Sequence, residues 1–117
     1  MRISTVLFDL DGTLLPMDMD TFSKAYFSGL ISCLRPFGIE ADELYAAFQG
    51  GINAMVKNNG GETNETVFWS YFRERFGDKV RDMLPAVNRW YREDFEKIRS
   101  SCGFNPLAAK AVARCKA

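Results

Sequence analysis

The stretch Asp9-Leu10-Asp11-Gly12-Thr13-Leu14 decides the fold expected of this chain. It follows an almost continuous apolar segment, residues 3–8, which is typical of a strand buried on both faces of a parallel sheet. Burial of unpaired carboxylates is costly, and open α/β sheets place their ligands at the carboxyl ends of their strands. The sequence therefore predicts a ligand site at Asp9 and Asp11, where hard oxygen atoms suit Mg²⁺.

A plainer interpretation is that this stretch is only a turn, because Asp-Gly is a common turn signal after a strand. An isolated Asp-x-Asp-Gly would be weak support for a catalytic site. Here the apolar strand, both acids, Gly12 and Thr13 all occur together within the first fifteen residues. That combination favours the functional interpretation.

The string from Val6 to Thr13 resembles the first motif of the haloacid dehalogenase-like (HAD) superfamily of hydrolases, in which apolar residues precede Asp-x-Asp-Gly-Thr. The resemblance implies that Asp9 is a nucleophile that forms an aspartyl-phosphate. It implies that Asp11 protonates the leaving oxygen and then activates water. It also implies that the Asp9 carboxylate and the Asp11 backbone carbonyl bind Mg²⁺. Gly12 would permit the tight turn, and Thr13 would help to fix the phosphate-facing loop.

Asp11 narrows the reaction that the resemblance implies. Members that cleave carbon–halogen or carbon–phosphorus bonds do not carry Asp at the matching position, so its presence favours phosphate esters over a dehalogenase reaction. The expected function is a Mg²⁺-dependent phosphatase acting on a small phosphorylated metabolite. Two alternatives stay open: a phosphomutase, which would share the same residues, and a non-catalytic helical binding module with a vestigial site.

Bulk composition agrees with a cytoplasmic enzyme that binds neither nucleic acid nor membranes. The chain has 117 residues with 15 basic and 15 acidic side chains, so no polyanionic partner is implied. It has no His, which excludes His-based triads and His metal ligands. Three widely spaced Cys, at positions 33, 102 and 115, are expected to be free thiols. No signal peptide or membrane-spanning stretch is evident.

Beyond residue 16 the pattern predicts helices. Apolar residues at three-to-four spacing mark four of them, at about 21–37, 41–57, 63–76 and 79–99. Asp20 is the expected N-cap of the first helix and Gly77 the expected end of the third. Pro85 is expected to kink the fourth helix or to begin a new one. The aromatic stripes, including Trp69 and Trp90, are interpreted as core.

The expected fold class is α/β. Only the first strand and a later core helix of a HAD-like Rossmannoid core would be present, with an inserted all-α helical-bundle cap, so that the chain itself is mostly α. Residues 1–16 would form the strand and catalytic loop, 17–99 the cap, and 100–117 the return linker and core helix. Asn105 would cap that last helix and Pro106 would occupy its first position. A cap of this kind closes over an active site.

A lone strand cannot satisfy its backbone groups, and no later segment reads as its neighbour. The chain is therefore expected to be the amino-terminal portion of a larger active enzyme and to be incomplete by itself. The family's phosphate-holding Ser or Thr and Lys, and its further metal-binding acids, would follow Ala117. Candidate substrate contacts within the cap are the polar residues Lys24, Asn53, Lys57 and Asn58.

Overall fold

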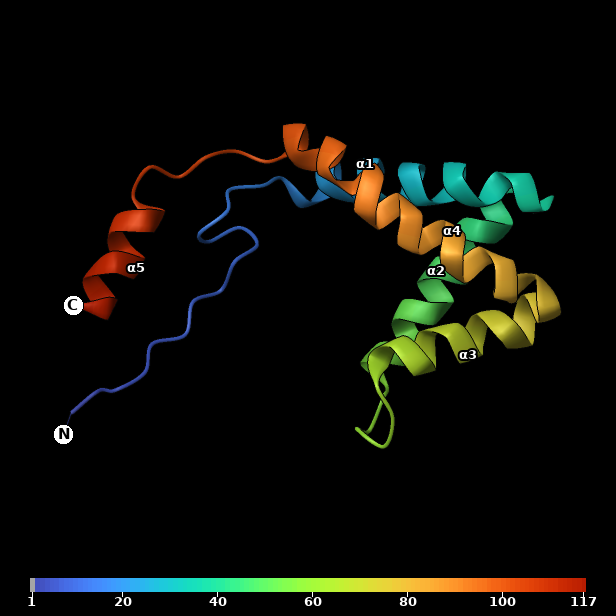
Figure 1. Ribbon diagram of the computed structural model, residues 1–117, viewed down its shortest axis with the longest axis horizontal. Helices are drawn as coiled ribbons and strands as arrows, with labels where there is room; N and C mark the ends of the chain where they lie inside the picture. Colours follow the sequence, from blue (N-terminus) through green and yellow to red (C-terminus); the bar gives the residue numbers. More distant parts are fainter. Residues whose placement is uncertain (1) are drawn as a thin grey trace. The chain divides into compact units, whose positions relative to one another are not determined.

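The computed structural model describes residues 2–117, so Met1, at the start of the expected strand region, lies outside it. The described residues form helices and irregular segments (Figure 1). The elements in chain order are α1 (Met19–Leu34), η1 (Arg35–Phe37), α2 (Ala41–Val56), α3 (Asn64–Phe76), η2 (Gly77–Lys79), α4 (Val80–Glu93), η3 (Phe95–Ser101) and α5 (Ala108–Lys116), where η denotes a 3₁₀ helix. Within residues 2–117, no helix is both long and apolar enough to cross a membrane.

The expected α/β fold class is wrong, because residues 2–117 contain no strand and no sheet. The apolar segment before Asp9 is irregular, and Ile3 and Leu7 are 75% and 91% exposed. None of the backbone groups of residues 2–9 bonds to another backbone group in the described chain. A strand exists only where a second segment accepts its hydrogen bonds, and the sequence pattern cannot supply that neighbour.

The chain divides into two compact units. One comprises residues 1–26 and 97–117, and the other comprises residues 27–96. The buried apolar residues of the second unit come from all four long helices and the turn after α1. They are Leu30, Leu34, Ile39, Leu44, Ala47, Phe48, Phe72, Val80, Met83, Val87 and Trp90. The helices predicted from apolar periodicity are thus confirmed as the elements that build this core.

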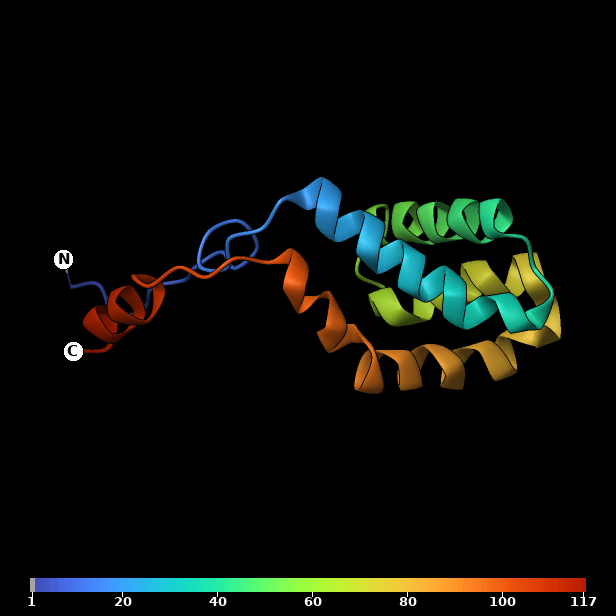
Figure 2. The same cartoon turned by 90° about the horizontal axis from the view of Figure 1, so that it is seen from above.

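Helices α2 and α3 run side by side within the 27–96 unit (Figure 2). Gly51 is buried, and a Cβ atom built on it would lie 2.6 Å from the Phe68 ring. A Cβ on Gly50 would overlap the phenol of Tyr71. The glycine pair therefore lets two α3 aromatic rings pack directly on the α2 backbone. Helix α2 continues through both glycines, so they permit close approach and do not end the helix.

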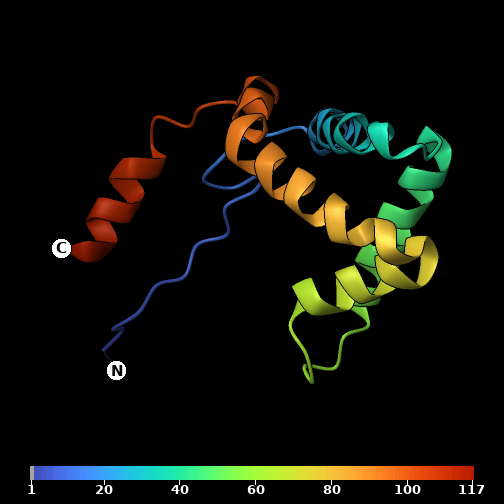
Figure 3. The ribbon, with the colours of Figure 1, turned by 45° about the vertical axis from the view of Figure 1, so that its right-hand side comes forward.

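The chain turns twice at short 3₁₀ segments in this unit. Gly38 ends η1 with a φ of 79°, and Gly77 follows α3 with a φ of 61°, values that glycine adopts without a side-chain clash. Figure 3 shows the second turn, where α3 passes through η2 into α4. The Lys79 ammonium donates a hydrogen bond to the Phe37 carbonyl at 3.4 Å, which links the two turns.

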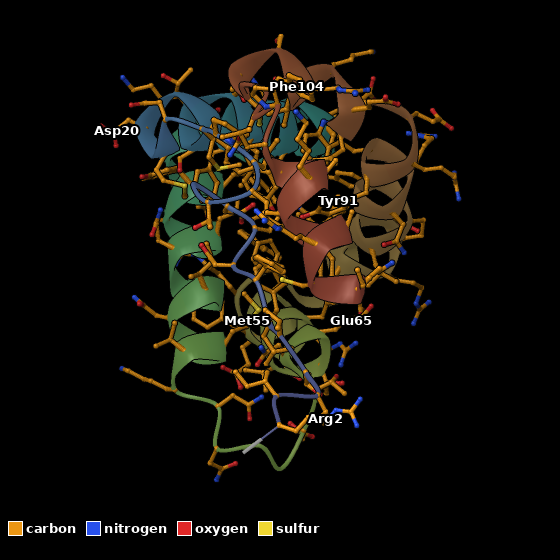
Figure 4. All side chains as sticks on the ribbon, turned by 90° about the vertical axis from the view of Figure 1, so that its left-hand side faces the viewer. Arg2, Asp20, Met55, Glu65, Tyr91 and Phe104 are labelled. Atoms are coloured by element: carbon orange, nitrogen blue, oxygen red, sulfur yellow. The ribbon has the colours of Figure 1, made fainter. Side chains whose placement is uncertain are left out.

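Several predicted helix boundaries are wrong, although the helices themselves are present. Helix α1 begins at Met19, and the Asp18 carboxylate, not that of Asp20, accepts a hydrogen bond from the Thr21 N–H at 2.8 Å. Figure 4 shows Asp20 projecting outward from the first turn of α1. Helix α4 continues through Pro85, so Pro85 does not begin a new helix. It ends at Glu93, before the separate η3 segment.

The last helix also begins later than predicted. Helix α5 starts at Ala108, and Asn105 and Pro106 belong to the turn before it. The Asn105 side chain accepts a hydrogen bond from the Leu107 N–H at 3.0 Å, and its carbonyl accepts one from the Ala108 N–H. Asn105 therefore closes an Asx turn in place of capping the helix.

We predict that Asp18 makes the helix content of the chain depend on pH. The Thr21 N–H lowers the pKa of the Asp18 carboxyl below its ordinary value of 3.8, so the folded state favours the ionised form. The stabilisation is present above the unfolded-state pKa and is lost as the pH falls through the lowered folded-state pKa. Asn is also a good N-cap but does not titrate. Asp18→Asn should therefore lose less far-UV circular dichroism at 222 nm between pH 5 and pH 2 than the parent chain; equal losses would contradict this role.

Candidate active site

Residues 10–15 form a compact loop directly after the irregular apolar segment. Three backbone hydrogen bonds close it: Gly12 N–H to Leu15 O at 2.8 Å, Thr13 N–H to Leu10 O at 3.1 Å, and Leu15 N–H to Leu10 O at 2.9 Å. The loop is thus held by its own backbone groups and needs no neighbouring strand. The loop predicted from the sequence exists, although the strand before it does not.

Gly12 determines the path of this loop. Its φ of 77° lies in the left-handed region, which side chains other than glycine rarely adopt. A Cβ built on it would meet nothing within 4 Å, so the requirement for glycine is conformational and not steric. The left-handed turn at Gly12 brings Thr13 back toward Asp9.

The Thr13 hydroxyl donates a hydrogen bond to Oδ2 of Asp9 at 2.8 Å. This bond fixes the orientation of an exposed carboxylate that makes no other side-chain hydrogen bond or ion pair within residues 2–117. Oδ1 of Asp9 is left for a substrate or a metal ion. A carboxylate held in this way can act as a nucleophile or as a metal ligand.

Asp11 lies in the same loop, where it pairs with Leu15 in an isolated bridge, and it is exposed. Its carboxylate forms no hydrogen bond or ion pair with other described residues, so it is free to exchange a proton with a bound molecule. The loop therefore presents two acids of different character. The Asp9 side chain is held by Thr13, while the Asp11 side chain is unrestrained.

The donors present suit a metal ion that takes few protein ligands. Within residues 2–117, no three acidic, Cys or His side chains gather into a metal-binding group. Residues 9–15 offer the Asp9 and Asp11 carboxylates, the Thr13 hydroxyl and backbone carbonyls, all of them hard oxygen donors. Mg²⁺ is commonly bound through one or two carboxylates, with water and substrate phosphate completing its coordination. The donor set fits Mg²⁺ and not a fully protein-ligated metal.

The two chain segments that flank the helical region meet beside the loop. The Gly103 N–H donates a hydrogen bond to the Pro16 carbonyl at 2.6 Å, and Met17 pairs with Cys102 in an isolated antiparallel bridge. A Cβ on Gly103 would lie 3.1 Å from the Cβ of Pro16. The chain thus leaves the loop and returns to it at one point, which anchors the end of the loop.

Among the four candidate substrate contacts in the cap, the structure gives a structural role to Asn58 but to none of the other three. The Asn58 side chain donates to the Glu62 carbonyl and to Oδ1 of Asn64, both at 2.9 Å, so its amide holds the loop between α2 and α3. Lys24, Asn53 and Lys57 are exposed and form no side-chain contact that defines a site.

The three cysteines are free thiols, and burial raises the pKa of the Cys33 thiol, which makes it a poor nucleophile.

Comparison with known proteins finds no matching family model, no similar curated protein and no similar solved structure for this chain. The resemblance of Val6–Thr13 to the haloacid dehalogenase-like motif therefore stays a prediction. The structural support for chemistry at this position is the loop itself, and above all the hydrogen bond between Thr13 and Asp9.

Proposed function

We propose that the chain carries the nucleophile and the acid/base of a Mg²⁺-dependent phosphate monoester hydrolase that acts on a small phosphorylated metabolite. The observation that carries the proposal is the 2.8 Å hydrogen bond from Thr13 to Asp9. It orients the predicted nucleophile and leaves one of its oxygen atoms for attack. The backbone-closed loop, with Gly12 in the left-handed conformation, provides further support.

In the first half of the reaction, Oδ1 of Asp9 attacks the phosphorus atom of the ester. The bond between phosphorus and the leaving oxygen breaks, and the protonated Asp11 carboxyl donates its proton to that oxygen. The alcohol departs, and the phosphoryl group remains on Asp9 as an aspartyl-phosphate. The Thr13 hydroxyl holds Oδ2 of Asp9 throughout, which limits rotation of the carboxylate.

In the second half, a water molecule attacks the phosphorus of the aspartyl-phosphate. Asp11, now a carboxylate, accepts a proton from that water. The bond between phosphorus and Asp9 breaks, so that inorganic phosphate is released and the Asp9 carboxylate is restored. Asp11 is protonated again, and the chain is ready for another ester.

The Asp9 carboxylate and the Asp11 backbone carbonyl would hold Mg²⁺ in this proposal. When bound, the ion supplies positive charge against the phosphoryl oxygens. No ammonium or guanidinium group pairs with Asp9 within residues 2–117. Because such preorganised charge usually supplies most of the rate in phosphoryl transfer, we expect turnover by this chain to be slow.

Beryllium trifluoride, which mimics a phosphoryl group on a carboxylate, tests the proposal without requiring turnover. We expect a bound fluorine resonance in ¹⁹F NMR that requires Mg²⁺ and is absent from Asp9→Asn. Asp42→Asn is the matched control, because Asp42 is an exposed acid on the first turn of α2. A bound resonance that persists in Asp9→Asn, or that never forms in the parent chain, would contradict the proposal.

A further inference from the structure

A cavity of about 420 Å³ opens at the turn between α3 and α4, in the 27–96 unit. It contains none of the residues of the proposed hydrolase site. Its volume falls within the range of pockets that bind small molecules. The lining residues are Trp69, Arg73, Gly77, Asp78, Val80, Arg81 and Leu84.

One side of the cavity is aromatic and held in place. The Trp69 indole packs edge-to-face against the rings of Phe68 and Phe72, with centroids 5.3 and 5.5 Å apart. These contacts fix the plane of the indole while part of it stays exposed. Val80 and Leu84, one turn apart on α4, add apolar surface. A fixed indole beside aliphatic groups favours a flat apolar ligand.

Two arginines without protein partners are among the residues that line the cavity. Arg73 and Arg81 are exposed, and neither forms an ion pair or a side-chain hydrogen bond within residues 2–117. Asp78 is the one acid among the lining residues, so the charges around the cavity sum to +1. Guanidinium donors match the geometry of a carboxylate or a phosphate.

Arg75, which lies on α3 with Arg73, differs from both cavity arginines because its guanidinium has partners. Its guanidinium donates to the Tyr71 hydroxyl at 3.4 Å and lies 6.0 Å from the centre of the Phe76 ring. It does not line the cavity. Arg73 and Arg81 are thus distinguished from a neighbouring arginine both by their position and by their lack of partners.

At the turn itself the cavity is lined by a residue without a side chain. Gly77 lines it, and a Cβ built there would meet nothing within 4 Å. The space beside Gly77 is therefore open to a ligand.

We propose that this cavity binds a small aromatic anion. The ring of the ligand lies against Trp69, and its carboxylate or phosphate group bonds to Arg73 and Arg81. The proposal is independent of the hydrolase function, because it uses different residues and requires no reaction. A cavity lined by one indole and two arginines suits a small molecule better than a flat protein surface.

Three probes, tested on the full 117-residue chain, distinguish recognition of the aromatic ring from recognition of the negative charge. Indole-3-acetate has both the ring and the charge, 3-methylindole has only the ring, and acetate has only the charge. We expect indole-3-acetate to shift the Trp69 indole N–H resonance in ¹⁵N-resolved NMR and to bind at least about tenfold more tightly than either half. Equal affinity for all three probes, or no binding of indole-3-acetate at millimolar concentration, would overturn the proposal.

Arginine variants test the position of the anionic group. Arg81→Gln and Arg73→Gln should each lower the affinity for indole-3-acetate by about tenfold, since each removes a charge-assisted hydrogen bond. Arg75→Gln should bind indole-3-acetate with the affinity of the parent chain. Unchanged circular dichroism would show that each variant folds. Equal weakening in all three variants would overturn the proposal. So would displacement of indole-3-acetate by tetraglutamate at equal concentration, which would indicate a surface for acidic protein segments.

Discussion

The Asp9→Asn variant is expected to hydrolyse p-nitrophenyl phosphate about a thousandfold more slowly than the parent chain, or not at all. An amide oxygen is a far weaker nucleophile than a carboxylate oxygen, and it does not form a stable acyl phosphate. The Thr13 hydroxyl can still donate to the amide oxygen of Asn, so the loop should keep its shape. The measurement is the Mg²⁺-dependent release of p-nitrophenolate.

Two comparisons make this result specific. Asp42→Asn should keep the parent rate, because Asp42 lies on α2 and outside the loop. Asp11→Asn should slow the hydrolysis of an alkyl phosphate more than that of p-nitrophenyl phosphate, because p-nitrophenolate leaves without needing a proton. Chelation of Mg²⁺ should abolish the rate in every variant. Turnover that survives in Asp9→Asn would rule out this carboxylate as the nucleophile.

Phe72→Ala should lower the free energy of unfolding by about 3–5 kcal/mol, the range for large-to-small changes at buried aromatic residues. Phe72 is 0% exposed, and its ring centroid lies within 4.7–5.5 Å of four other aromatic rings. Those rings belong to Phe48, Phe68, Trp69 and Phe76. Removing this ring leaves a cavity at the contact between α2 and α3. Urea unfolding followed by circular dichroism at 222 nm measures the change.

Phe104→Ala is the matched control for this prediction. Phe104 is 86% exposed on the irregular segment before α5, so its removal should change the free energy of unfolding by less than about 0.5 kcal/mol. Figure 4 labels Phe104 on that segment. Similar effects of the two substitutions would mean that the aromatic contacts of Phe72 do not determine the stability of the helical unit.

Helices and turns could be predicted because their causes are local. Apolar spacing marked α2 and α3 to within a residue or so, and Gly77 was correctly identified as the end of α3. The loop of the candidate site could also be predicted, since the hydrogen bonds that close it join residues only three to five positions apart. A helix or tight turn bonds to itself, so a short stretch of sequence contains most of what determines it.

The helix boundaries that were predicted wrongly depend on competition between neighbouring side chains for the same backbone N–H groups. Both Asp18 and Asp20 could have capped α1, and only the backbone geometry selects Asp18. Asn105 serves the turn before α5 and not the helix, for a similar reason. Residue preferences are too alike at such sites to choose among positions one or two apart.

The sequence by itself determined the helical segments and the tight turn at Gly12, whereas the hydrogen bond from Thr13 to Asp9 came only from the structure. Only the tertiary structure decided that residues 2–9 form no strand, that Gly50 and Gly51 receive the rings of α3, and that Trp69 meets Arg73 and Arg81 around a cavity. Helical and turn contacts lie within a few residues of one another. Strand pairing, packing of rings on a backbone, and cavities instead require atoms from segments whose approach no local pattern specifies.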